Sequence, residues 1–155
     1  QTKIDCYTLF AIISENNLSL LEEIIKNYSF DINKFLPSVP PILNFAIMQN
    51  NLAAVKILLR RDDIKISPSA IKLVVSKGYN DILHELLKHK NITFRVKDNK
   101  TDCPLIFTII QSENIEAIRE IIKHPSIDLN ITCKRKPLKD FTKNQEIIDL
   151  LVSST

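Results

Sequence analysis

The chain has 155 residues, of which 45% are hydrophobic and 25% are charged, a composition that supports one hydrophobic core and gives no sign of two domains. Its 21 basic and 18 acidic residues give a net charge of +3, which is too balanced to predict a nucleic-acid-binding protein. No apolar run approaches the roughly 18 residues that cross a bilayer, so we expect no membrane insertion.

Cysteine and glycine usage exclude further classes. Cys6, Cys103 and Cys133 form no disulfide framework, so we expect free thiols and a cytoplasmic protein. The single glycine, Gly78, excludes phosphate-binding loops, which need several glycines. Residues 1–5 lack the basic-then-apolar pattern of a signal peptide, and the missing initiator Met suggests an excised domain or a trimmed chain.

One short phrase recurs four times along the chain, a polar turn followed by a helical pattern that ends in two apolar residues. The copies are Asn16-Asn17-Leu18 with Ile24-Ile25, Asn50-Asn51-Leu52 with Leu58-Leu59, Gly78-Tyr79-Asn80 with Leu86-Leu87, and Glu113-Asn114-Ile115 with Ile121-Ile122. Successive copies lie 34, 28 and 35 residues apart, and a second phrase centred on residues 31, 65, 93 and 128 repeats at the same spacings. Two columns that keep register through a six-residue deletion predict a repeat protein of stacked helical units.

The second unit indicates how each unit folds. Pro41 suits the first turn of a helix, and an apolar stripe follows at Leu43, Ala46 and Ile47. Asn50 can end this helix in the left-handed conformation, as can its equivalents Asn16 and Gly78. A second helix over residues 52–59 follows, and the alternation at residues 64–66 predicts a brief extended outer loop.

These residues resemble the ankyrin repeat. Residues 41–46 (PILNFA) are similar to the family pattern T-P-L-H-x-A, residues 50–59 to G-H-x-x-x-V-x-x-L-L, and residues 30–33 and 124–130 to the loop that carries D-x-N. The resemblance covers about residues 6–152, and the phrase HPSIDLN resembles arrays of protozoa and intracellular microbes in particular. It implies an all-α ankyrin-repeat solenoid of about four and a half helix-turn-helix units with short β-like outer loops. A tetratricopeptide array is the main competitor, but its pattern needs tryptophan, which this chain lacks.

The array departs from the family pattern in several places. We expect a single domain over residues 1–155, with units at roughly 5–37, 38–67, 68–97, 98–132 and 133–155. The histidine of T-P-L-H, which ties neighbouring loops together in the family, is replaced by Phe10, Asn44, Lys72 and Ile106. The third unit lacks about six residues of its outer loop and should be the weak joint, whereas the fourth needs one extra residue before its turn. The fifth is shortened, with a clipped first helix.

The second apolar residue of each repeated pair should be buried at equivalent places. This column consists of Ile25, Leu59, Leu87 and Ile122.

No constellation of catalytic or metal-binding residues is present, so we expect no enzyme, no cofactor and no metal. A catalytic thiolate needs a nearby histidine, and neither Cys6 nor Cys133 has one close in sequence. His84, His89 and His124 do not have metal-ligand spacing, and a histidine at a helix C-terminus is explained by the helix dipole. The P-x-x-P of residues 37–41 is explained by a loop that ends where a helix begins.

A solenoid presents a long surface, and the family resemblance implies a non-enzymatic protein–protein interaction scaffold. Ankyrin arrays bind partners at the concave face of their first helices and at their loop tips. Carried over to this chain, the expected partner-binding residues are Gln49, Lys77 and Gln111 on first helices, Arg61 and His89 at the rim, and Lys97, Lys100, Lys134, Arg135 and Lys136 on loop tips.

The loop-tip residues predict a basic edge, because only Asp98 and Asp102 oppose the lysines and arginine there. We therefore expect a protein partner with an acidic or phosphorylated segment. Aromatic residues do not interleave with the lysines as a base-stacking surface requires, so we expect no nucleic acid. We expect a monomer, although the sequence leaves the oligomeric state open.

A second hypothesis about function stays open. The array could be a targeting or regulatory segment of a larger enzyme, transporter or microbial effector, whose activity resides in other residues.

Overall fold

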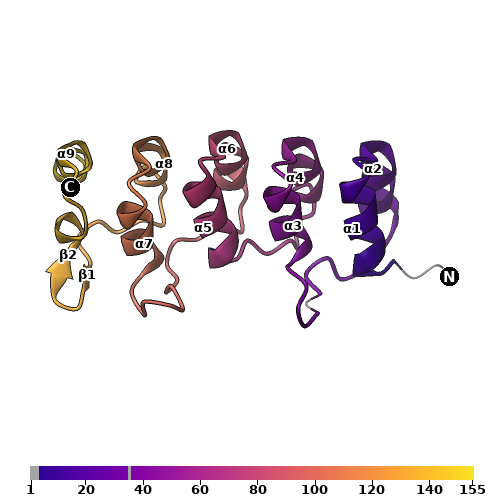
Figure 1. The fold of residues 1–155 in the computed structure, drawn as a ribbon, viewed down its shortest axis with the longest axis horizontal. Helices are drawn as coiled ribbons and strands as arrows, with labels where there is room; N and C mark the ends of the chain where they lie inside the picture. The colour runs from indigo at the N-terminus through magenta and orange to yellow at the C-terminus, as the bar shows by residue number, and fades with distance from the viewer. Residues whose placement is uncertain (1–3, 35) are drawn as a thin grey trace.

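The computed structural model describes residues 4–34 and 36–155. Helices α1–α8 form four pairs that stand side by side in one row (Figure 1). The pairs are α1 (Cys6–Ser14) with α2 (Leu18–Asn27), α3 (Ile42–Met48) with α4 (Leu52–Leu58), α5 (Pro68–Lys77) with α6 (Asn80–Lys88), and α7 (Leu105–Gln111) with α8 (Ile115–Ile121). The row ends with strands β1 (Thr132–Cys133) and β2 (Lys136–Pro137), the 3₁₀ helix η1 (Leu138–Phe141) and α9 (Gln145–Ser153). The all-α solenoid is confirmed, and a 3₁₀ turn stands where a fifth first helix would be.

A left-handed residue separates the two helices of each of the four pairs. Asn16, Asn50 and Gly78 have φ angles of 54°, 49° and 70°, so asparagine takes the place of glycine as predicted. Glu113 has a φ angle of 56° at the equivalent place in the last pair. One glycine is therefore enough for four turns.

The asparagine after the turn starts the second helix and also links neighbouring pairs. The side-chain oxygens of Asn17, Asn51 and Asn114 each accept a hydrogen bond from the backbone N–H three residues later. The amide of Asn51 also donates to Asn16 Oδ1 at 2.9 Å, and that of Asn114 donates to the carbonyl of Val75 at 2.9 Å. A short polar turn thereby both caps a helix and fixes its distance from the preceding pair.

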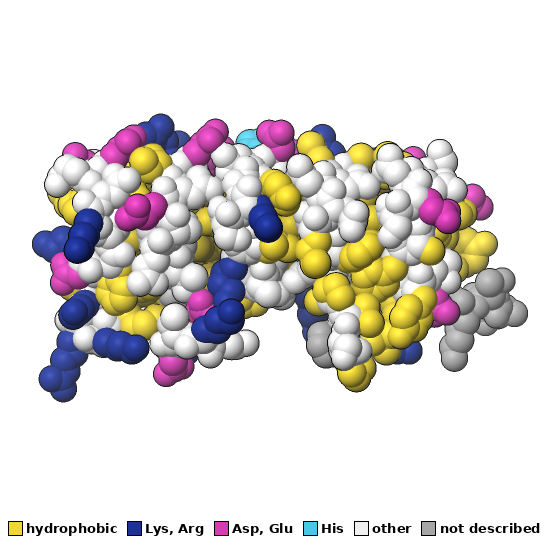
Figure 2. Space-filling model, in the orientation of Figure 1, with side chains coloured by type: hydrophobic (Ala, Val, Ile, Leu, Met, Phe, Trp, Pro, Cys, Tyr) yellow, Lys and Arg dark blue, Asp and Glu magenta, His cyan; other side chains and the backbone are white. Residues whose placement is uncertain are grey.

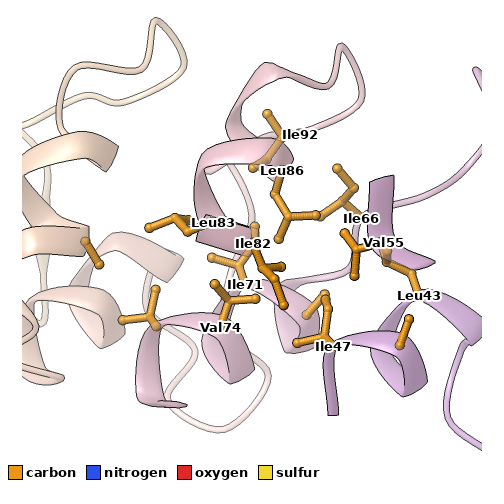
Figure 3. Packing of buried hydrophobic residues seen from close by; sticks show 14 of the residues in the cluster. Leu43, Ile47, Val55, Ile66, Ile71, Val74, Ile82, Leu83, Leu86 and Ile92 are labelled. Carbon is orange, nitrogen blue, oxygen red and sulfur yellow. The ribbon is translucent and has the colours of Figure 1, made fainter. Parts of the chain in front are cut away.

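The core is one continuous layer between the helix pairs. Figure 3 shows Leu43 of α3 beside Val55 of α4, and Ile71 and Val74 of α5 beside Ile82 of α6. The predicted buried column is correct in the first unit, where Ile25 is buried, and is displaced by one residue in the other three. Leu59, Leu87 and Ile122 are only partly buried, whereas the first residue of every pair, Ile24, Leu58, Leu86 or Ile121, is buried. The prediction was wrong in those three units because both residues of each apolar pair contact the core and the first is the more deeply buried.

The fourth unit needs no extra residue, contrary to the prediction. Helices α3 and α7 both have seven residues, and each begins after a proline and ends before a left-handed residue. In this register Phe107, and not Ile106, is equivalent to Asn44 and Lys72. Phe107 is buried and packs edge-on against Phe141, with ring centroids 4.7 Å apart.

The ties that the family's histidine would provide are made here by other side chains. The Asn44 amide donates to Ser69 Oγ at 2.8 Å, which links α3 to α5. The Lys72 ammonium donates to Asp98 Oδ1 at 2.9 Å, which links α5 to the loop before α7. Loss of the histidine therefore leaves the links between neighbouring units in place.

Loops extend on the first-helix side of the row at three places (Figure 1). We name them finger 1 (residues 36–41), finger 2 (residues 96–104) and the C-terminal hairpin (residues 132–137). Finger 1 and finger 2 each contain an isolated bridge, Leu36 with Val39 and Lys97 with Pro104, and the hairpin contains β1 and β2. The connector before α5 is short and forms no finger, which confirms the shortened loop (Figure 1).

The short connector is nevertheless tied to both neighbours. Asn33 bonds the carbonyl of Asp63 and the N–H of Lys65, both at 2.8 Å. The Asn91 amide donates to the carbonyls of Asp62 and Ile64 at 2.7 and 2.8 Å. Asparagines on both sides therefore bond the backbone of the short connector, and the weak joint at the third unit stays a prediction.

The pairing of two cysteines corrects the expectation of free thiols. Cys103 of finger 2 and Cys133 of β1 form a disulfide, with Cα atoms 5.6 Å apart and both residues buried. The two cysteines lie 30 residues apart in sequence, so the sequence did not show that they are close. They come together because finger 2 and the C-terminal hairpin are neighbours in the row. Cys6 is a free, partly buried thiol.

Candidate partner-binding surface

The predicted first-helix residues lie at the exposed ends of their helices. Gln49 follows α3, Lys77 ends α5 and Gln111 ends α7, and all three are exposed. Gln49 and Lys77 immediately precede left-handed residues, so they are equivalent. Gln111 stands one place earlier, where α3 has Met48. The exposed row along α3, α5 and α7 is called the first-helix face below.

The predicted rim residues Arg61 and His89 hold loops of the array together. The Arg61 guanidinium bonds both carboxylate oxygens of Asp63 at 2.8 and 2.7 Å and the carbonyl of Phe30 at 2.9 Å, and it lies 4.9 Å from the centre of the Phe30 ring. His89 Nε2 lies 3.2 Å from the carbonyl oxygen of Arg61. The hydrogen bond from Arg61 lowers the pKa of Asp63, and the same bond raises the pKa of Arg61. These groups already have partners in neighbouring units.

Finger 2 is organised around the buried carboxylate of Asp98, which is only 1% exposed. Asp98 accepts hydrogen bonds from the Thr108 hydroxyl at 2.6 Å, the Lys100 backbone N–H at 3.0 Å and the Lys72 ammonium at 2.9 Å. These bonds, that of Thr108 foremost, lower its pKa to about 2. The carboxylate therefore fixes the shape of finger 2 and is not available to a partner.

The predicted cations of finger 2 differ in their freedom. Lys97 lies 3.2 Å from Asp102 in an exposed ion pair, so its charge is partly compensated. Lys100 has an exposed side chain, and only its backbone N–H is bonded within the finger. Since Lys72 compensates Asp98, Lys100 carries the excess positive charge of finger 2.

The C-terminal hairpin brings three predicted cations to its tip. Lys134 and Arg135 have φ angles of 51° and 64°, the left-handed pair that a tight two-residue hairpin turn requires. Cys133 pairs with Lys136 across the turn, and Cys133 and Leu138 are buried at its base. Lys134, Arg135 and Lys136 are all exposed, so the hairpin points three consecutive charges away from the core.

The basic edge is therefore concentrated at one end of the row. Residues 132–143 contain five basic residues and one acidic residue, whereas the rest of the chain contains 16 basic and 17 acidic residues. Figure 2 shows Lys and Arg side chains gathered at this end, around the hairpin and finger 2. The segment thus carries more positive charge than the whole chain does.

An apolar area that the sequence did not predict lies at the other end of the row. Figure 2 shows hydrophobic side chains over α1, α3 and finger 1. Tyr7 and Met48 are 63% and 55% exposed, and the rings of Phe10 and Phe45 meet edge-on with centroids 4.5 Å apart. Met48 lies beside the predicted Gln49, at the place equivalent to Gln111, and the sequence gave no sign that α1 and finger 1 extend an apolar surface from it. Helices α1 and α3 contain no charged residue, but α7 contains none either, so this signal does not single out the N-terminal end.

Neither a metal site nor a membrane helix is found in the described ranges. No group of three or more His, Cys, Asp or Glu residues among them could hold a metal ion. None of their helices is long and apolar enough to cross a bilayer.

Comparisons with known proteins support the fold. No sequence model of a protein family matches the chain, and no curated protein sequence matches it. Among solved structures, the crystal structure of EF0377, an ankyrin repeat protein, matches with a TM-score of 0.75 at 15% sequence identity. The match covers 98% of this chain and 83% of that chain. The row of helix pairs, the left-handed turns and this match together show that the chain has the ankyrin-repeat fold.

Proposed function

We propose that this chain is a non-enzymatic protein-interaction module that binds a protein partner through its first-helix face and its fingers. The observation that carries the proposal is that the first helices of successive units stand in one row (Figure 1) and each has exposed polar side chains at or just after its end. Among the described residues, the buried polar side chains are Asn44, Asp98 and Thr142, and each is hydrogen-bonded to a neighbour. Their engagement in structural bonds supports recognition over catalysis.

The charge distribution supports a partner with an acidic or phosphorylated segment. Lys100, Lys134, Arg135 and Lys136 are exposed on finger 2 and the adjacent hairpin, and the disulfide links these two loops. A positive edge of this kind accelerates the encounter with an acidic partner and makes binding weaker at high salt. Arg61 and His89 are omitted from the proposed surface because their polar groups bond neighbouring units.

The test is affinity capture at low and high salt with three forms of the folded chain. One form is wild type, and the second has Lys100, Lys134, Arg135 and Lys136 replaced by Glu. The third is a matched control with Lys26, Lys56, Lys65 and Lys123 replaced by Glu, four exposed lysines outside the fingers and the hairpin. Both variants change the net charge equally.

We expect one protein to be captured by the wild type and the control and lost by the edge variant, with faster association of the purified pair at low salt. If the edge variant and the control lose the captured protein equally, binding depends on the net charge of the chain and not on the basic edge. If neither high salt nor either set of four charge reversals changes the capture, the proposal of an acidic partner is contradicted. Failure of the wild type to bind any protein specifically would contradict the interaction module itself.

A further inference from the structure

The apolar area at the N-terminal end is a feature of the surface that the basic edge does not explain. Tyr7 and Met48 are mostly exposed, and the edge-on pair of Phe10 and Phe45 lies on the same two helices. Helices α1 and α3 contain no charged residue, and their exposed polar side chains, such as Thr8 and Ser14, are small and uncharged. Contiguous exposed apolar surface of this kind marks interaction sites in folded proteins.

A groove adjoins the apolar area beside finger 1. It has a volume of about 1140 Å³ and lies between the start of α1 and the finger, and its walls include Tyr7, Phe10 and Val39 as well as the charged Asp5 and Asp31. A groove of this size can receive several side chains of a peptide. The apolar area therefore offers depth as well as flat surface.

Charge separates this end of the row from the other. Residues 132–143 contain five basic residues and one acidic residue, whereas α1 and α3 contain none of either kind. A second copy of the chain seated on the apolar area would leave the basic hairpin without a counter-charge. A partner that is apolar at one end and acidic at the other complements both regions at once.

We infer that the first-helix face, together with α1 and the C-terminal hairpin at its two ends, is a two-part site for a single protein segment, with apolar side chains seated at Tyr7, Phe10, Phe45 and Met48 and carboxylates at the hairpin. This inference rests on the proposed function and adds that the partner segment has an apolar part beside its acidic part. Neighbouring first helices pack about 8–10 Å apart, so the hairpin lies about three such steps, or roughly 25–30 Å, from Met48. An extended chain covers that distance in about eight or nine residues.

Labelled synthetic peptides test the two-part site by fluorescence anisotropy. The first peptide joins a Phe-Leu-Phe block to a run of glutamates through about eight Gly and Ser residues, and it is made in both chain directions. The second has serines in place of the apolar block. The third has the composition of the first, but its apolar residues are dispersed among the glutamates. We expect the first peptide to bind about tenfold more tightly than the other two, because it alone reaches both regions.

Protein variants locate the two contacts. Met48→Glu should reduce binding of the first peptide to the level of the second. Val152→Glu is the matched control, because Val152 is 60% exposed and lies on α9, at the other end of the row. It should leave binding of the first peptide unchanged. The fourfold reversal of Lys100, Lys134, Arg135 and Lys136 should weaken all three peptides.

Three outcomes would overturn the inference. If the first and second peptides bind equally, or if Met48→Glu and Val152→Glu have the same effect, the apolar area is not part of the site. If sedimentation shows a dimer that Met48→Glu dissociates, the apolar area is an interface between copies. If the fourfold reversal still weakens peptide binding in these cases, the proposed basic edge stands. If the reversal has no effect on binding, the basic edge is contradicted as well.

Discussion

Fingers 1 and 2 occupy the same place in their units and are built in opposite ways. Finger 1 has one internal backbone bond, from the N–H of Val39 to the carbonyl of Leu36 at 3.2 Å, and its side chains are mainly apolar. Finger 2 has a buried carboxylate with three donors and a disulfide to the neighbouring hairpin. Both precede a seven-residue helix that begins after a proline. The helix pairs therefore do not dictate how a finger is held.

The difference suggests two modes of recognition on one scaffold. A finger held by several buried bonds presents its charges in a fixed geometry, so little entropy is lost when a partner binds. A finger with few internal bonds can adjust its apolar side chains to the shape of a partner. The comparison predicts that substitutions in finger 2 affect stability strongly and that those in finger 1 affect it weakly.

The core beneath the two fingers should respond equally, and this is the largest expected effect. Ile47 of α3 and Ile110 of α7 are fully buried, and each lies three residues before a left-handed residue. Replacing either by Ala should lower the free energy of unfolding by about 2–5 kcal/mol, as large-to-small core changes do. Urea denaturation would measure both. A clear inequality between them would mean that the two regions differ in their cores as well as in their fingers.

Removing the tie between finger 2 and the hairpin should have the next largest effect. Cys133→Ser should lower the free energy of unfolding of the oxidised protein by about 2–4 kcal/mol, because the disulfide closes a long loop in the unfolded chain. Cys6→Ser, at the free thiol, is the control and should change stability little. Thiol titration of the unreduced, unfolded protein should find one thiol. Three thiols would show that Cys103 and Cys133 are not joined.

Acid should weaken finger 2 through Asp98. Its pKa is lowered to about 2 from 3.8, so its stabilising contribution is complete above about pH 4 and is lost as the pH falls toward 2. The shift corresponds to about 2 kcal/mol at neutral pH.

Asp98→Asn should therefore destabilise the protein by about that amount at pH 7 and by little near pH 2. Asp102→Asn, at an exposed ion pair, is the control. A destabilisation by Asp98→Asn that does not change between these pH values would contradict the assigned role.

The sequence predicted the turn that recurs between the helices of each pair and missed the bonds between units that occur once. Asn16, Asn50 and Gly78 share one backbone conformation, and this was readable because the same turn repeats along the chain. The register of the buried column failed by one residue in three of the four units, since two adjacent apolar residues end each second helix and either could point inward. Repetition identifies a turn better than it distinguishes two neighbouring hydrophobic side chains.

The candidate site was predictable only in its exposed charges. The Lys134–Lys136 cluster stood out because a helix end did not explain it, and the structure places it on a hairpin tip. The bonds of Lys72 to Asp98 and of Cys103 to Cys133 join different units through positions that do not recur, so no repeat pattern reveals them. The apolar area was missed for a related reason, because Phe10 and Phe45 look like core residues until the helices are packed.

The smallest expected effect compares how firmly two strained turns are held. Ser38 of finger 1 and Arg135 of the hairpin both have left-handed backbones, with φ angles of 66° and 64°. Such a conformation costs a non-glycine residue roughly 1 kcal/mol, which glycine avoids. Strand pairing and the disulfide at Cys133 fix the hairpin, so Arg135→Gly should recover most of this cost and raise the free energy of unfolding by about 0.5–1 kcal/mol. Finger 1 can relax around Ser38, so Ser38→Gly should gain less.

Urea denaturation of both variants, with Ser29→Gly as an exposed control in an ordinary loop, measures the difference. An equal gain in the free energy of unfolding at both turns would mean that finger 1 is held as firmly as the hairpin. The two ends of the row would then differ in charge and not in how firmly their loops are held.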